Sequence, residues 1–295
     1  MGYLLFFIAL CAGTVKSFCG KKTSGYTSNY NDATLANIIR LVLCIVIGFL
    51  LILVTGDLSK LTMSRELFFI SLLSGVSTAV FLVTWLISVK NSAYMMLDIF
   101  SMLGVAIPLV ASGIFFDEVV KPTQWVGIGV LLVAVIIMCS YNNSIKTKIT
   151  PSSLILLLLC GASNGISDFS QKLFSKTMTD GSAAVFNFYT YIFAAVILIV
   201  FFALTHKKEQ SIDRENVKKI FPFILTMAIC LFAYSYFRTL AAGYLSAVLL
   251  YPLNQGCNLI VSSIMAAVAF KEKLTVKATI GIITAFVGLL IINVL

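Results

Sequence analysis

The amino-acid sequence predicts an all-α polytopic membrane protein, with ten transmembrane helices arranged as two inverted five-helix repeats. The composition is 60% hydrophobic and only 11% charged, whereas soluble domains carry roughly 25% charged residues. Several uncharged runs approach the ~20 residues that cross a bilayer as a helix. Two stretches 154 positions apart also share one pattern of charged turn and apolar helix. Together these observations predict a membrane protein built from a repeat.

Ten apolar segments are expected to form the spans, and the short connections between them leave no room for a separate soluble domain. The segments are 3–20, 35–54, 66–89, 92–116, 123–141, 151–173, 182–205, 219–240, 244–270 and 276–294. We therefore expect one integral membrane unit in contact with the lipid bilayer.

The net charge of +9 comes from basic residues scattered singly between the apolar segments. Positive loops are typical of membrane insertion, so we expect no nucleic-acid partner. The seven cysteines lie mainly in apolar segments and form no C-x-x-C pair, which indicates neither a zinc site nor a disulfide framework. The single histidine, His206, lies in a polar loop. Without clustered His, Asp or Glu we expect no metal, no cofactor and no enzymatic activity.

The repeat is clearest in FFDEVVKPTQWVGIG (115–129) and AFKEKLTVKATIGII (269–283). It divides the chain into a first repeat, 1–142, a linker, 143–150, and a second repeat, 151–295. Because five is odd, the second repeat must cross the membrane in the opposite sense. Glu118 and Glu272 then lie some ~30 Å apart on opposite faces. We expect each carboxylate to steady its own turn at the start of the following helix.

These halves resemble the drug/metabolite transporter superfamily, EamA-like branch. The resemblance rests on the charged turn followed by small residues seven apart (Gly127 and Ala134, Gly281 and Gly288), and on LSAVLLYPL, FKEKLT and IGIITAFVGLLII in the second half. It implies a multi-pass transporter in the plasma (inner) membrane, without a cofactor, as a monomer or weak homodimer. It also implies cytoplasmic termini, whereas most basic residues favour the opposite orientation, so orientation stays open. The first-span glutamate of the small-multidrug branch is absent, so its mechanism is not expected.

Ionisable residues inside spans are candidate site residues, because each costs at least ~2.5–3.5 kcal/mol to insert. Tyr94, Asp98 and Ser101 share one face of the fourth span. The ninth span, at the equivalent position, carries Pro252 in a polar stripe formed by Tyr251, Asn254, Gln255 and Asn258. We expect the two stripes to face each other across a central cavity.

Further candidates are Asn164 and Asp168 in the sixth span, and Trp85 and Arg238 near the ends of the third and eighth. Structural alternatives remain for each. Asp98 could pair with Arg238, and Asp168 could lie at the membrane interface. The ninth-span amides could join helices, Trp85 could belong to an aromatic belt, and Arg238 or Lys172 could extend to the surface.

The function predicted from these residues is secondary transport of a small polar metabolite by alternating access, with proton coupling as an option. Asp98 favours a cationic or zwitterionic solute such as an amino acid or an amine. The alternatives are a sugar or nucleotide-sugar carrier of the same superfamily, or a non-transporting membrane subunit or sensor.

Overall fold

The computed structural model describes residues 1–24, 30–90, 101, 104–140, 151–205, 214–269 and 276–294. Across these ranges it is helical, without strands. The helices of the first half are α1 (Gly2–Ser24), α2 (Tyr30–Thr55), the short 3-10 helix η1 (Asp57–Leu61), α3 (Arg65–Lys90), α5 (Ala106–Phe116) and α6 (Pro122–Ser140). Those of the second half are α7 (Pro151–Thr177), α8 (Ala183–Thr205), α9 (Arg214–Tyr244), α10 (Ala247–Ala269) and α11 (Val276–Val294).

The expected apolar segments coincide with these helices, with differences at their ends. α2 begins at Tyr30, so the polar residues before the apolar run are already helical. α7 continues to Thr177, past the predicted end at residue 173. In the fourth segment the described helix is α5, and Pro108 lies in its first turn, where a missing N–H leaves no helix bond unmade. Hydrophobic runs therefore predict where the helices lie better than where they end.

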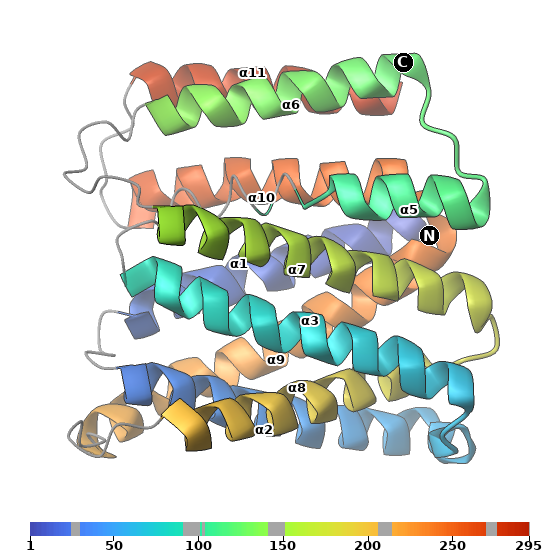
Figure 1. Ribbon diagram of the computed structural model, residues 1–295, viewed down its shortest axis with the longest axis vertical. Helices are drawn as coiled ribbons and strands as arrows, with labels where there is room; N and C mark the ends of the chain where they lie inside the picture. Colours follow the sequence, from blue (N-terminus) through green and yellow to red (C-terminus); the bar gives the residue numbers. More distant parts are fainter. Residues whose placement is uncertain are drawn as a thin grey trace.

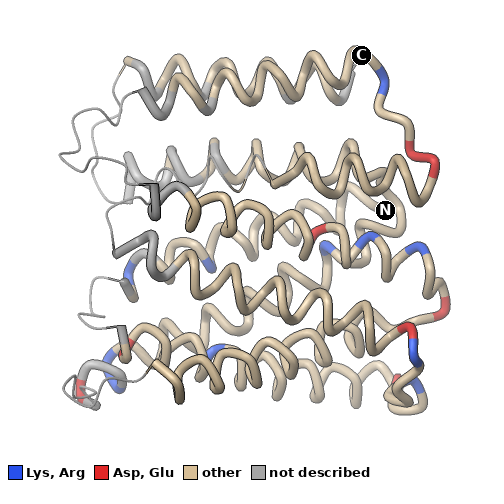
Figure 2. Tube along the Cα trace, viewed as in Figure 1, with Lys and Arg blue, Asp and Glu red and all other residues tan. Residues whose placement is uncertain are grey.

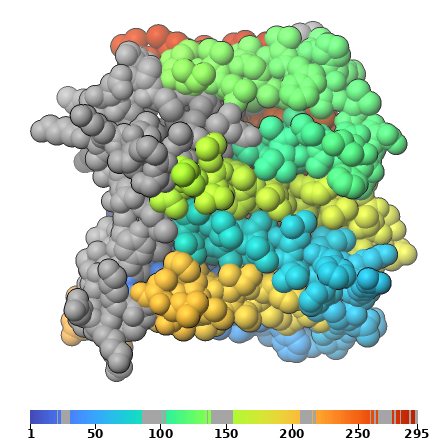
Figure 3. Space-filling view, in the orientation of Figure 1, coloured from blue at the N-terminus to red at the C-terminus, as the bar shows by residue number. Residues whose placement is uncertain are grey.

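The helices lie side by side and alternate in direction along the chain (Figure 1). The main packing partners come from opposite halves: α1 packs on α9, α2 on α8, α3 on α7, and α6 on α11. In the space-filling view, α3 lies between α7 and α8 (Figure 3). The core is thus formed between the two halves rather than inside each one.

The outer surface is apolar along the helices. Phe7, Val46, Val200 and Ile229 are among many large hydrophobic side chains left exposed there, and charged residues gather at the helix ends (Figure 2). Five helices among the described residues are long and apolar enough to cross a membrane, and three shorter helices are also apolar. An apolar girdle with charges at both ends is the arrangement that a bilayer requires.

The spaced small residues that follow the charged turns bring α6 and α11 into close contact. A Cβ atom at Gly127 would lie 2.6 Å from Ile292 Cγ1 and 3.0 Å from the Gly288 carbonyl oxygen. One at Gly288 would lie 3.0 Å from the carbonyl oxygen of Gly127. Each glycine therefore permits the backbone of the other helix to approach, as small residues do between membrane helices.

Replacing Gly127 with valine is expected to destabilise the protein by about 1–3 kcal/mol, because the new methyl groups overpack this contact. The matched control is Gly129→Val in the same helix, where an added Cβ meets nothing within 4 Å. Thermal unfolding of both variants in the same detergent provides the measurement. Equal unfolding temperatures for the two variants would contradict the packing account.

Candidate functional site

A cavity of about 220 Å³ lies inside the bundle. Its walls come from α1, α2 and α3 of the first half and from α7, α8, α9 and α10 of the second, together with Ser101. Six of the side chains predicted from sequence line it: Trp85, Ser101, Asn164, Arg238, Gln255 and Asn258. A polar cavity enclosed by helices with apolar outer faces can hold a solute away from lipid.

Arg238 is at the centre of the polar network in this cavity. Its Nη1 lies 2.8 Å from Asp168 Oδ1 and donates a 2.8 Å hydrogen bond to the hydroxyl of Tyr234. Its Nε donates to Gln171 Oε1 at 2.9 Å. Arg238 and Tyr234 are four residues apart in α9, and Asp168 and Gln171 are three apart in α7, so each pair shares a helical face. The guanidinium is therefore held in one orientation from two helices.

Asp168 is fully buried, which overturns its interpretation as a shallow residue at the membrane interface. α7 continues nine residues beyond it, to Thr177, so it lies about 13 Å from the helix end, whereas the predicted end at residue 173 would place it only ~8 Å from that end. Asp168 also pairs with Arg238, so the alternative in which this arginine extends to the surface does not hold. A buried charged pair of this kind costs desolvation, which its mutual attraction and added hydrogen bonds must offset.

Two further predicted residues lie behind the cavity wall rather than on it. Tyr251 is buried and donates a 2.6 Å hydrogen bond to the main-chain oxygen of Asp168. Asn254 is also buried, and its Nδ2 donates to the Tyr234 hydroxyl at 2.8 Å. α10 therefore supports the cavity residues of α7 and α9. Tyr94, Asp98 and Glu272 lie outside the described residues.

Sequence reasoning did not select Arg40, Thr190 or Tyr234, although all three line the cavity. Arg40 lies inside the predicted span 35–54 and could have been found from the cost of a charge inside a membrane helix. Tyr234 could have been found from its i, i+4 spacing to Arg238. Thr190 carries no comparable signal, since threonine is common on helix faces.

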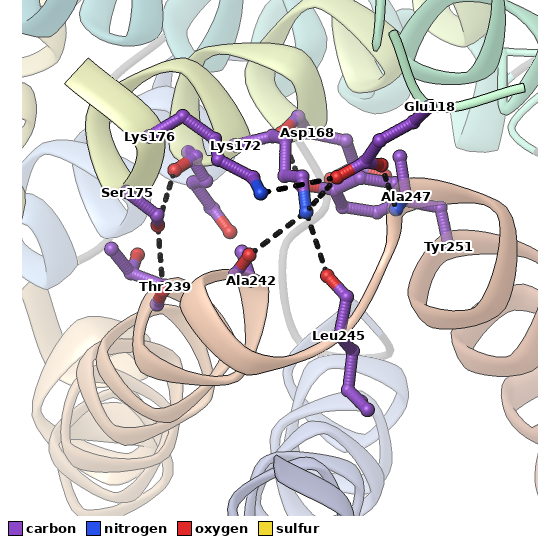
Figure 4. Close-up of polar contacts among 11 residues, drawn as sticks. Glu118, Asp168, Lys172, Ser175, Lys176, Thr239, Ala242, Leu245, Ala247 and Tyr251 are labelled. Atoms are coloured by element: carbon purple, nitrogen blue, oxygen red, sulfur yellow. Dashed lines mark hydrogen bonds and ion pairs between the residues drawn. The ribbon is translucent and has the colours of Figure 1, made fainter. Parts of the chain in front are cut away.

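A second polar cluster joins the halves at the break between α9 and α10 (Figure 4). Lys172 of α7 is buried and donates to two carbonyl oxygens at the end of α9, those of Ala242 at 3.0 Å and Leu245 at 2.7 Å. Glu118 Oε2 accepts a 2.7 Å hydrogen bond from the N–H of Ala247, the first residue of α10. Lys172 Nζ and Glu118 Oε1 are 2.8 Å apart. One ion pair thus caps the C-terminal end of α9, which carries partial negative charge, and the N-terminal end of α10, which carries partial positive charge.

The structure changes two interpretations here. Glu118 was expected to steady the start of the helix that follows it, but it caps α10 in the other half of the chain. Asp117, in the left-handed region at φ 53°, ends α5 and sets the backbone direction into Glu118. Lys172 does not extend to the surface; its buried ammonium pairs with Glu118.

Another polar contact links the halves in the connections between helices. Ser182, just before α8, donates a 2.7 Å hydrogen bond to Asp57 Oδ2 in η1, and Lys60 lies 3.2 Å from Asp57 Oδ1. The Ser182 hydrogen bond, aided by Lys60 and Thr55, holds the pKa of Asp57 below its ordinary value. The charged carboxylate is therefore the form that makes this contact.

Removing the ammonium in Lys172→Met is expected to destabilise the protein by about 3 kcal/mol or more, because Glu118 and two helix carbonyls lose their partner. Lys176→Met is the matched control. Lys176 lies 3.6 Å from the same carboxylate, but its side chain is 41% exposed, so a loss below about 1 kcal/mol is expected. Thermal unfolding compares the two, and similar losses would show that burial of Lys172 adds nothing.

Among the described residues, no group of three or more His, Cys, Asp or Glu is placed to hold a metal ion. The chemistry that the cavity offers is binding by hydrogen bonds and charge. Its only charged lining residues in the described ranges are Lys16, Arg40 and Arg238.

Comparison with known proteins agrees with this architecture. Residues 151–294 match the model of the EamA-like transporter family. The second half of the chain is thus similar to the EamA-like transporters, and this match supports the drug/metabolite transporter superfamily for the protein. This family consists of multi-pass integral membrane proteins, so the apolar helices are membrane helices.

Solved structures extend the likeness in fold to the first half. Twenty-eight chains match, and one of them, described in the words "Crystal structure of protein", superposes with a TM-score of 0.79. The superposition covers 99% of this chain and 96% of that chain, at 12% sequence identity. At that identity the likeness concerns the fold alone. None of the curated proteins compared matches this chain.

Proposed function

We propose that this EamA-like protein is a secondary transporter that moves a small polar metabolite by alternating access. The observation that carries the proposal is the polar cavity inside the apolar bundle, with walls from both halves. A structural subunit has no need for buried polar side chains around an empty space, since such groups are costly without partners. A solute-binding site does need them.

The proposal includes ten membrane spans in two inverted repeats, 1–142 and 151–295, with 143–150 as the linker. Three features support it. α1 and α7, the first helices of each half, run in opposite directions (Figure 1). If each helix is replaced by its equivalent in the other half, the α1–α9 pair becomes the α7–α3 pair. The α2–α8 and α6–α11 pairs are unchanged by the same exchange. This reciprocal packing is what a two-fold axis in the membrane plane produces.

Alternating access also needs contacts that close one end of the cavity and that can break to open it. The Glu118–Lys172 pair suits that role, because it ties a turn of the first half to three helices of the second. The contact of Ser182 with Asp57 adds a second tie between the halves. Both ties are polar and local, so rocking of the halves could exchange them for water without opening an apolar core.

The solute in this proposal is an amino acid, an amine or a related small molecule, carried across the plasma (inner) membrane. Asp98 would contact an ammonium group or carry a coupling proton, and it lies outside the described residues. The cavity of about 220 Å³ is smaller than the roughly 300–1,000 Å³ of drug-sized ligand pockets. That size disfavours the nucleotide-sugar alternative.

A tryptophan at Ser17, which lines the cavity from α1, is expected to abolish solute uptake by filling the space. Val15→Trp is the control, because Val15 lies on the same helix with 42% of its side chain exposed. Uptake into proteoliposomes should be measured for solutes that raise the unfolding temperature of the wild type, with and without a proton gradient. Undiminished uptake by Ser17→Trp would rule out this cavity as the route.

A further inference from the structure

We infer that the cavity selects solutes carrying a carboxylate group, which Arg40 and Lys16 bind together with the cavity-facing part of Arg238. This inference rests on the proposed transport function, because it names the chemistry of the same cavity. It goes beyond that function by requiring an acidic group on the solute, so an amine without a carboxylate would not be accepted.

The charges around the cavity do not balance. Its three charged lining residues in the described ranges are Lys16, Arg40 and Arg238, and all three are basic. Asp168 offsets one of these charges through its pair with Arg238. The described wall therefore keeps an excess of positive charge at low dielectric, where a bound anion is strongly favoured.

Arg40 has an unused hydrogen-bond donor. Its side chain is 93% buried, since only 7% is exposed, yet its Nε has no hydrogen-bond partner among the described residues. Arginine has donors only and no acceptor. A buried donor without a partner is costly, and Arg40 lines the cavity, so an acceptor bound there would supply the missing partner.

Two other lining residues extend this argument. Asn164 Nδ2 and Thr190 Oγ1 are buried and also lack hydrogen-bond partners in the described part of the chain. An amide nitrogen donates, and a hydroxyl can donate or accept. Acceptors without a hydrogen-bond partner occur on Asp32 and Asn254 and at Asp168 Oδ2, but none of these three residues lines the cavity. The hydrogen-bonding atoms of the cavity wall that lack a partner therefore favour a ligand rich in acceptor oxygens.

The side chains around the cavity also favour a flat ligand group. The planar guanidinium of arginine matches a carboxylate with two parallel hydrogen bonds. Tyr234 adds a flat wall beside the cations: Lys16 Nζ lies 4.3 Å and the Arg238 guanidinium carbon 4.6 Å from its ring centre. A cavity of this size and charge fits a short organic acid or a zwitterionic amino acid.

The test uses three four-carbon probes that differ only in their end groups: succinate with two carboxylates, 4-aminobutanoate with one carboxylate and one ammonium, and putrescine with two ammoniums. Binding to the purified full-length protein is measured by calorimetry and by thermal stabilisation. We expect succinate and 4-aminobutanoate to bind and putrescine to bind at least about tenfold more weakly, which corresponds to ~1.4 kcal/mol. Inorganic phosphate is included as a compact anion without a carboxylate.

Variants connect the binding to the named side chains. Arg40→Gln is expected to weaken binding of the carboxylate probes about 10- to 100-fold, the effect of losing a charge-assisted hydrogen bond. Lys16→Gln should also weaken binding of the carboxylate probes. Because the Lys16 side chain is only half-buried, this variant is less prone to misfold than Arg40→Gln. The control is Lys22→Gln, an exposed lysine later in the same helix, which should leave binding unchanged.

Several outcomes would overturn the inference: putrescine binding as tightly as the carboxylates, phosphate binding when neither carboxylate does, or no carboxylate binding at millimolar concentration. Equal weakening by Lys22→Gln and Lys16→Gln would overturn it too. Measuring solute uptake as well as binding distinguishes a failure of this inference from a failure of the proposed function. Carboxylate binding without uptake into proteoliposomes contradicts the transport function alone, and uptake of putrescine without carboxylate binding contradicts the carboxylate site alone.

Discussion

The ion pair between Lys172 and Glu118 fixes the contact between the two halves of the chain at the break between α9 and α10. A break between two helices leaves free carbonyls at one end and free N–H groups at the other, and neither can stay unpaired in a membrane. The ammonium of Lys172 bonds the carbonyls that end α9, and the carboxylate of Glu118 bonds the N–H that begins α10. Because these two groups also pair with each other, one interaction closes the break and fixes α5, α7, α9 and α10 in register.

That register positions the neighbouring polar residues. Asp168 is one helical turn before Lys172 on the same face of α7, where it meets Arg238 of α9. Tyr251, one turn into α10, bonds the main chain of Asp168. The cavity network is therefore continuous with the capped break, and a movement of Glu118 would displace the helices that hold Arg238.

The positions of the helices were predictable because runs of apolar residues near the thickness of a bilayer have few alternative structures. Asp168 and Arg238 were predictable as site candidates, since each places a charge in an apolar helix. Their pairing was not, because it depends on the relative register of α7 and α9. Glu118 was assigned to its own turn because a local cap explains a carboxylate equally well from sequence. Arg40 was missed because it lies near the start of the predicted span 35–54, where a long basic side chain can extend to the surface, whereas α2 begins at Tyr30 and places it further from the helix end.

The unbalanced charge of the cavity wall also affects how the protein responds to voltage. Moving one elementary charge through the membrane potential changes the energy by about 2.3 kcal/mol per 100 mV. Lys16 and Arg40 add positive charge that Asp168, paired with Arg238, does not cancel. If the cavity moves relative to the membrane field, the vacant protein carries that charge with it, whereas a bound acid would neutralise part of it. The step that moves the vacant cavity and the step that moves the loaded cavity would then differ in their dependence on voltage.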